Sequence, residues 1–519
     1  MDEQYDVVVI GSGLGGLVSA NILAKEGYKV CILEKNNQYG GNLQTFARDK
    51  TIFDTGVHYI GGLSEGQNLY KYFKYLEIMD DLQLKKLDEE GFDIITFEGD
   101  ETEYKHAQGY VAFIKTLVEQ FPEEEEGIRA YCQSLKDTCH KFPLYELRVG
   151  SSYYEDLDIF EIPAKTHINS FTSNKKLQAV LAGTNFLYAG DSDKTPFYVH
   201  ALSINSYIER AYRCINGGSQ ISKVLIRKLK ENGGHAFKRH EVTKFCFEDQ
   251  KITSVLTANG KEIKGKLFIS NVDPKGTLRL VGRDRFRKSY YKRVQNIESI
   301  IAGFSLYIVL KPGSFKYLNK NYYHVKDYTR IWELQDYEEE KWPEGYMVSM
   351  GIKKHTDQWG DSLTIMTYMK YDEVAPWENT FNTAANKNER GQTYEEFKAQ
   401  KAERLLQEVE KKFPNIRDCI KAMYTSTPLS YRDYIGIDKG SIYGYVKDVN
   451  NPLRSFISPK TKIKNLYFTG QCLNMHGILG VTISGVITCS EILGREYLVN
   501  KIVAANTEKV MEYKDHGAV

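Results

Sequence analysis

The residues Tyr5-Asp-Val-Val-Val-Ile10-Gly11-Ser-Gly13-Leu-Gly-Gly16 join an apolar run to a glycine-rich turn. A helical stretch over 17–26 follows, and a second apolar run over 28–33 ends on Glu34. This order of strand, GxGxxG turn, helix, strand and acid is the fingerprint of a dinucleotide-binding unit. Gly11 permits the tight turn, Gly13 lets the backbone approach a pyrophosphate, and Gly16 lets the helix pack on the strand. The sequence therefore predicts a dinucleotide site at the start of the chain.

The segment after Glu34 favours FAD over NAD. Glu34 can accept a hydrogen bond from a ribose hydroxyl, and the helix N-terminus offers N–H groups to phosphates. A second glycine pair, Gly40-Gly41, follows soon after this acid. Glycines lack a Cβ and let the chain pass close to a bulky, buried cofactor. An ordinary surface turn is the alternative explanation of this pair.

Three blocks of sequence resemble one family of flavoproteins. Their order and content are similar to the all-trans-retinol saturase branch of the phytoene desaturase and carotenoid isomerase superfamily. The most specific block is Phe53-Asp54-Thr55-Gly56-Val57-His58-Tyr59-Ile60-Gly61. The other blocks are Pro196-Phe-Tyr-Val-His200-Ala-Leu with Gly217-Gly218-Ser219, and Tyr467-Phe-Thr-Gly470-Gln471 continuing through Gly480 to Ser490. The wider superfamily often has Arg after the second glycine pair; this chain has Asn42, which argues against an amine oxidase.

The resemblance implies a set of FAD-binding residues. A helix beginning near Gly480 would aim its N-terminus at the flavin, where backbone N–H groups stabilise negative charge. Val242 would pair its backbone with the adenine, and Gln471 stands where related enzymes often have an acid. The full expected set is Gly11, Gly13, Leu14, Gly15, Gly16, Glu34, Lys35, Gly41, Asn42, Val242, Gly470, Gln471, Gly480 and Val481.

Candidate catalytic residues also come from the resembling blocks. Saturation of a C=C bond needs a hydride from the flavin and a proton from an acid or water. His58 and Tyr59 would lie near the flavin and could donate that proton, although His58 could equally hold a loop by hydrogen bonds. The expected substrate channel is lined by Tyr188, Tyr198, His200 and Tyr207.

Composition excludes several other classes of protein. The chain has 519 residues, 42% hydrophobic and 26% charged, which is typical of a globular protein. A net charge of +1 gives no indication of nucleic-acid binding. The eight cysteines contain no CxxC pair, so we expect no metal site and a reducing compartment, with Cys31 and Cys246 in the core. We expect no signal peptide and no transmembrane helix, since no run of about 20 apolar residues occurs.

The chain is expected to be α/β, with a doubly wound Rossmann-type FAD-binding domain and an inserted mixed-sheet α+β substrate domain. Both domains are discontinuous in this prediction. The FAD-binding domain comprises 1–75, 205–290 and 416–499, the substrate domain 76–204 and 291–415, and 500–519 forms a loose tail.

The leading hypothesis is an FAD-dependent oxidoreductase that saturates one double bond of a retinoid-like or carotenoid-like polyene. A carotenoid desaturase and a reduced-flavin cis–trans isomerase share the same motifs, and a non-catalytic prenyl- or lipid-binding protein is a remote alternative. A second nucleotide fingerprint is absent from the sequence, so electrons would be exchanged with NAD(P)H, a quinone or a redox protein. A water-insoluble substrate implies a cytoplasmic protein that contacts the membrane peripherally.

Overall fold

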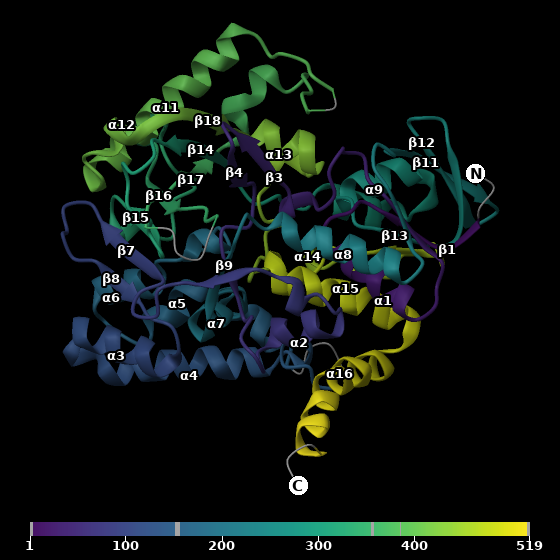
Figure 1. The fold of residues 1–519 in the computed structure, drawn as a ribbon, viewed down its shortest axis with the longest axis horizontal. Helices are drawn as coiled ribbons and strands as arrows, with labels where there is room; N and C mark the ends of the chain where they lie inside the picture. Colours follow the sequence, from purple (N-terminus) through teal and green to yellow (C-terminus); the bar gives the residue numbers. More distant parts are fainter. Residues whose placement is uncertain (1–3, 151–155, 354–357, 385, 516–519) are drawn as a thin grey trace.

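The computed structural model of the chain describes residues 4–150, 156–353, 358–384 and 386–515. Two large sheets occupy different parts of the molecule (Figure 1). The first lies on the right of the view, with strands in the order β10 His235–Phe237, β2 Val30–Leu33, β1 Gln4–Ile10, β13 Glu262–Ser270, β12 Lys251–Thr257 and β11 Val242–Glu248, while β19 Leu466–Phe468 pairs with β13. The second, at the upper left, follows the order β18 Ile420–Ser426, β14 Ala302–Leu310, β17 Ser362–Met369, β16 Gly345–Ser349, β15 Asn321–Val325, β7 Asp93–Phe97 and β8 Tyr104–His106.

The first sheet has a parallel centre that is buried on both faces. Strand β1 pairs in parallel with β2 and β13, so that Val8 is opposite Cys31 and Phe268. Helices cover this centre because parallel strands need crossover connections. Helix α1 Leu14–Lys25 packs against α8 Ser219–Glu231 and α15 Gly477–Leu493. This is the α/β arrangement with a Rossmann-type sheet that the sequence predicts.

The second sheet is mixed. Strand β15 pairs in parallel with β7, whereas β14 runs antiparallel to both β17 and β18. Every residue of β14 is buried, which explains its continuous apolar sequence. The helices packed around the two sheets include α2 Asn68–Tyr75, α3 Tyr110–Gln120, α4 Glu125–His140, α5 Ala164–Asn169, α6 Lys175–Leu181, α7 Phe197–Glu209, α9 Pro274–Val281, α10 Lys288–Gln295, α11 Gln392–Lys412, α12 Ile416–Cys419, α13 Pro428–Ile435 and α14 Pro452–Ser455.

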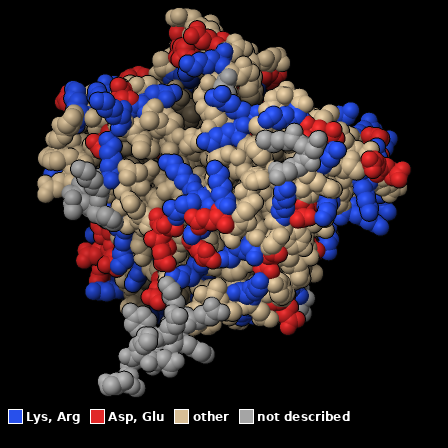
Figure 2. All heavy atoms as spheres, turned by 45° about the vertical axis from the view of Figure 1, so that its right-hand side comes forward, with Lys and Arg blue, Asp and Glu red and all other residues tan. Residues whose placement is uncertain are grey.

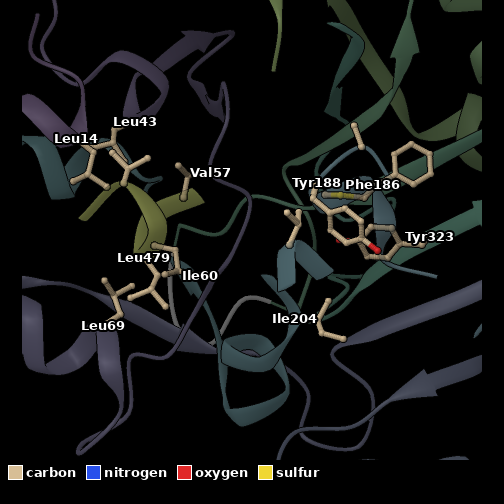
Figure 3. Close-up of a cluster of buried hydrophobic side chains, with 14 of the residues drawn as sticks. Leu14, Leu43, Val57, Ile60, Leu69, Phe186, Tyr188, Ile204, Tyr323 and Leu479 are labelled. Atoms are coloured by element: carbon tan, nitrogen blue, oxygen red, sulfur yellow. The ribbon is translucent and has the colours of Figure 1, made fainter. Parts of the chain in front are cut away.

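Short strands connect the two parts. Strand β9 Ala211–Cys214 pairs with β5 Ile60–Gly61 and with β6 Leu84–Lys86, and β3 Thr45–Arg48 forms a hairpin with β4 Thr51–Asp54. The apolar core is continuous across this region. Figure 3 shows Leu14 and Leu43, from the glycine-rich end of the chain, near Val57, Ile60 and Leu479. All five residues belong to one buried cluster, which also contains Tyr323 of the second sheet.

Several elements differ from the sequence-based expectations. Residues 262–270 form the single strand β13, which pairs with β1 in one register from Gln4–Lys264 to Ile10–Ser270. Cys246 is half-buried, since its neighbours Phe245 and Phe247 alternate with it along β11. Helix α15 begins at Gly477, ahead of Gly480. Helix α7 crosses the expected domain boundary between 204 and 205.

The expected loose tail is helical in its described part. Helix α16 Arg495–Asp515 leaves the body at the bottom of Figure 1 and packs against α2 and α15. Leu498 and Ile502 lie one turn apart and are fully buried. The sequence analysis overlooked Ile502, and the burial of this residue fixes the first turns of the helix. Residues 516–519 of the tail lie outside the described residues.

No helix among the described residues combines the length and the apolar character that crossing a bilayer requires. On the face shown in Figure 2, basic and acidic side chains are interspersed, which matches the net charge of +1.

Candidate active site

Three glycines shape the turn between β1 and α1. Gly11 has a φ of +91°, which side-chain-bearing residues rarely adopt. A Cβ on Gly16 would lie 2.3 Å from the carbonyl oxygen of Gly11, and a Cβ on Gly15 would lie 2.9 Å from Gly470. Gly15, Gly16 and Gly470 therefore allow α1, the turn and the end of β19 to meet. The turn leaves α1 without a side-chain cap at its N-terminus.

The acid at the end of β2 is held in a defined position. Glu34 is buried, and its carboxylate accepts hydrogen bonds from the backbone N–H groups of Ser12 at 3.0 Å and Asn36 at 2.8 Å. These bonds fix the carboxylate beside the glycine turn. Its position at the carboxyl end of a parallel strand is where ligands bind in open α/β sheets.

A cavity of about 400 Å³ lies along this edge of the sheet. Ten of the expected cofactor residues line it: Gly11, Gly13, Leu14, Glu34, Lys35, Gly41, Asn42, Val242, Gln471 and Val481. Gly15, Gly16 and Gly470 lie behind the cavity wall in the contacts described above. Gly480 contacts Met475 on the first turn of α15 and lines a neighbouring cavity.

Two of the expected polar residues come together from distant segments. The side-chain amide of Asn42 donates to Oε1 of Gln471 at 3.2 Å, so both face the same part of the cavity. Lys35 donates to the carbonyl oxygen of Asp433 at 2.8 Å. Burial lowers the pKa of the Lys35 ammonium.

Two groups of residues that the sequence did not predict stand out among those that line this cavity. Asn271 follows β13, and a Cβ on Gly13 would lie 2.5 Å from its Nδ2, so this side chain forms the floor under the glycine turn. The parallel pairing of β1 and β13 is the signal that could have identified it, because ligands gather at carboxyl ends of parallel strands. The second group has no such signal and comes from α13 and the loop after it: Tyr431, Tyr434, Ile435, Gly436, Ile437, Ile442 and Tyr443.

The N-terminus of α15 forms the far end of this cavity. His476 is its N-cap residue with no side-chain cap, and Gly477, Ile478 and Val481 line the cavity. The uncapped N–H groups and the helix dipole favour negative charge here. The side chain of His476 is occupied by a hydrogen bond between Nε2 and the carbonyl of Leu187 at 2.8 Å, and burial lowers its pKa to about 4.

A second cavity, of about 340 Å³, adjoins the first at this helix. Its lining is mainly aliphatic and aromatic, from α7, α14 and α15 and the segments that contact them. Ile60 and Leu479, which lie close together in Figure 3, both belong to its wall. The two cavities share the residues Leu187, Tyr207, His476, Gly477 and Ile478. We call the first the nucleotide cavity and the second the apolar cavity.

The four expected channel residues occupy different positions. Tyr198 lines the apolar cavity, and Tyr207 lines both cavities. Tyr188 lines a smaller, polar cavity next to them. His200 lies away from all three, fully buried, where it forms hydrogen bonds with Tyr131 at 2.7 Å and Tyr188 at 2.8 Å. Burial lowers the pKa of His200 to about 3, and its contacts are those of a neutral structural histidine.

His58 and Tyr59 both line the nucleotide cavity. Nε2 of His58 is buried and has no hydrogen-bond partner among the described residues, and burial lowers its pKa to about 4. The Tyr59 hydroxyl donates to Oδ2 of Asp93 at 2.8 Å and lies 2.7 Å from the Tyr323 hydroxyl. Burial raises the pKa of Asp93 to about 7, against hydrogen bonds from Asn321 and Tyr59 that favour the carboxylate.

The described residues contain no group of three or more His, Cys, Asp or Glu that could hold a metal ion. The eight cysteines form no disulfide among the described residues. Cys31 is fully buried in β2, as expected.

Comparison with known proteins agrees with this geometry. Residues 9–76 match the model of an NAD(P)-binding Rossmann-like domain. The all-trans-retinol 13,14-reductase of Rattus norvegicus is 26% identical over 98% of this chain and 88% of that protein. Prolycopene isomerase 2 of an Oncidium hybrid cultivar is 27% identical over 93% of this chain and 83% of that protein. The chain is thus similar in sequence to these reductases and isomerases over nearly its whole length.

Solved structures show the same fold. An oxidoreductase from Methanosarcina mazei superposes with a TM-score of 0.61 at 15% identity, covering 94% of this chain and all of that one. The chain thus shares its overall fold with this solved structure.

Proposed function

We propose that the nucleotide cavity binds FAD. The observation in support is the glycine turn: added Cβ atoms on Gly13, Gly15 and Gly16 would each meet protein atoms at under 3 Å, so only glycine lets this turn pack closely enough to form one end of the cavity. Glu34 is placed for a ribose hydroxyl, and the uncapped end of α15 suits the negative charge of a reduced flavin. The free Nε2 of His58 offers a further polar contact.

We propose that the apolar cavity binds a polyene lipid. The observation that carries this proposal is the set of residues shared by the two cavities at the N-terminus of α15, because a lipid in the apolar cavity would then lie beside a flavin in the nucleotide cavity. A conjugated hydrocarbon chain needs an apolar wall and few polar groups. When bound, reduced FAD supplies the hydride for a C=C bond.

We propose that Tyr207 supplies the proton. It is half-buried and lines both cavities, its ring lies 4.5 Å from that of Tyr59 at a tilt of 39°, and its hydroxyl makes no hydrogen bond to a described residue. The Tyr59 hydroxyl is already engaged with Asp93 and Tyr323. We therefore assign proton donation to Tyr207, with Tyr59 beside its ring.

Saturation of one double bond is the direction we propose. Desaturation and reduced-flavin isomerisation use the same two cavities and are the alternatives in the same class, and a lipid carrier is the alternative without catalysis. NAD(P)H, a quinone or a redox protein would exchange electrons with the flavin. The relatives named as reductases favour saturation.

Product mass separates these activities. FAD-loaded protein, in one arm reduced with dithionite and in the other left oxidised, is incubated anaerobically with all-trans-retinol and, separately, with prolycopene. A gain of two hydrogens in the product supports saturation. An unchanged mass with an altered retention time points to isomerisation, and a loss of two hydrogens with oxidised flavin points to desaturation. Unchanged polyenes in every condition would overturn the enzyme assignment.

We propose peripheral membrane contact at the mouth of the apolar cavity. Leu157, Leu453 and Phe456 line this cavity and are 70%, 80% and 41% exposed. Exposed apolar side chains at a cavity mouth suit entry of a lipid from a bilayer. Liposome flotation of Leu453→Asp tests this, with Val111→Asp on α3 as the control because Val111 is 86% exposed away from the cavity. Equal flotation of both variants and the parent would contradict the proposal.

A further inference from the structure

A third cavity, of about 210 Å³, meets both of the others. Its lining is polar and contains the charged residues Asp191, Lys194, Glu298, Asp336 and Lys447. It shares His476 and Lys447 with the apolar cavity, and Gln471, Tyr443 and His476 with the nucleotide cavity. A ligand in the apolar cavity can therefore place one end at a polar junction beside the redox centre.

Lys447 stands at this junction without a carboxylate partner among the described residues. Its Nζ donates to the carbonyl oxygen of Leu473 at 3.0 Å. By contrast, Lys194 in the same polar cavity is paired with Glu298 at 2.9 Å. Lys447 is the one lysine or arginine among the described residues that line the apolar cavity. A half-buried ammonium that lacks a counter-ion costs desolvation free energy, which an anionic ligand would offset.

We propose that Lys447 binds the carboxylate of an acidic polyene lipid. The proposal rests on the proposed function and specifies its substrate class: an apolar chain in the apolar cavity, with an anionic end at the junction. The ammonium would donate a charge-assisted hydrogen bond to the carboxylate. An apolar wall with one basic residue at its polar end is complementary to a fatty or retinoid acid and less so to a pure hydrocarbon.

The charged and titratable groups around Lys447 determine the pH dependence. Burial lowers the pKa of Lys447 to about 8 and that of His476 to about 4, and burial keeps Cys472 a neutral thiol. Lys447 thus loses its proton as pH rises through about 8, whereas His476 and Cys472 stay neutral there. Carboxylate affinity should fall over this range. The remaining charged groups nearby are Asp448, Asp191, Asp336 and the Lys194–Glu298 pair.

A matched pair of polyenes tests the proposal. All-trans-retinoic acid and all-trans-retinol differ only at the polar end, and their dissociation constants for the oxidised, FAD-loaded protein are measured by quenching of protein fluorescence. Lys447→Met should weaken retinoic acid binding by about tenfold or more and leave retinol binding unchanged. Lys447→Arg should retain acid binding. Lys194→Met, which removes a paired lysine from the same polar cavity, should change neither.

The outcomes separate this proposal from the proposed function. If retinol binds, and retinoic acid binds equally well to the parent and to Lys447→Met, the role of Lys447 is overturned. The proposal that the apolar cavity binds a polyene would still hold. An equal loss of both ligands in Lys447→Met would also overturn the role of Lys447, since the residue would then only shape the cavity. Failure of the parent protein to bind either polyene would overturn both proposals.

Discussion

The nucleotide cavity and the apolar cavity meet at one helix but are built differently. One end of the nucleotide cavity is lined by Gly11, Gly13, Leu14 and Glu34, which come from one short segment with a defined backbone turn. The apolar cavity is formed by side chains from α7, α14, α15 and several loops that are distant in sequence. Backbone geometry tolerates few substitutions, whereas an apolar wall tolerates many of similar volume. The nucleotide cavity can therefore be predicted from a sequence motif, whereas changes in the lining of the apolar cavity can alter substrate preference.

The glycine turn should show the largest effect. In Gly16→Ala the new Cβ would lie 2.3 Å from the Gly11 carbonyl oxygen, and the turn would have to shift at a cost of about 1–3 kcal/mol. We expect the purified variant to lose most of its flavin absorbance. Gly276→Ala is the control, because its Cβ would meet the nearest atom of another residue at 3.7 Å, also within a helix. Full flavin content in Gly16→Ala would show that the backbone cradle is not needed.

Tyr207→Phe tests the proposed proton donor, which lines both the nucleotide cavity and the apolar cavity. Loss of a proton donor should lower the rate of polyene reduction by about 10²–10⁴-fold, while flavin content and polyene binding stay unchanged. Tyr198→Phe, which changes another tyrosine of the apolar cavity, should have a small effect on rate. Rapid-mixing measurement of flavin reoxidation gives both rates. Equal rates in the two variants would remove Tyr207 from the proton-transfer step.

Asp93, which accepts a hydrogen bond from Tyr59, should make the free energy of unfolding depend on pH. Its pKa is raised to about 7 in the folded protein, because burial favours the protonated carboxyl. The contribution of Asp93 to the free energy of unfolding is therefore fully present below its ordinary pKa near 4 and is lost as pH rises through 7. The loss should amount to at most about 4 kcal/mol. Asp93→Asn should flatten the fall in unfolding free energy between pH 5 and 8, measured by urea titration. The exposed Asp193→Asn is the control; identical profiles for both variants would contradict this assignment.

The apolar wall should show the smallest effect. Leu202 is half-buried on α7 and lines this cavity, so Leu202→Asp places a charge where the polyene chain would lie. We expect polyene affinity to fall about tenfold or more, with flavin content unchanged. Leu202→Met, which conserves volume, should bind normally. A parallel loss of flavin would show that the two cavities are not separable.

The sequence predicted the part of the site that a short motif encodes. The turn at Gly11–Gly16, Glu34, Asn42 and Gln471 were expected from spacing and resemblance, and all line or support one cavity. The hydrogen bond between Asn42 and Gln471 was not predicted. The segment around Tyr443 could not be predicted, because it reaches the cavity only through the packing of α13. His200 looked like a channel residue in sequence, but hydrogen bonds to Tyr131 and Tyr188 hold it in the core.

The central claim is that a polyene lies against a flavin at the N-terminus of α15, and anaerobic absorbance spectroscopy tests it most directly. The purified protein is reduced with dithionite and then titrated with all-trans-retinol or lycopene. The account predicts a flavin spectrum at the start and, on adding an accepted polyene, flavin reoxidation with stoichiometric loss of polyene absorbance. A protein without flavin bands, or a reduced flavin that leaves every polyene unchanged, would contradict it.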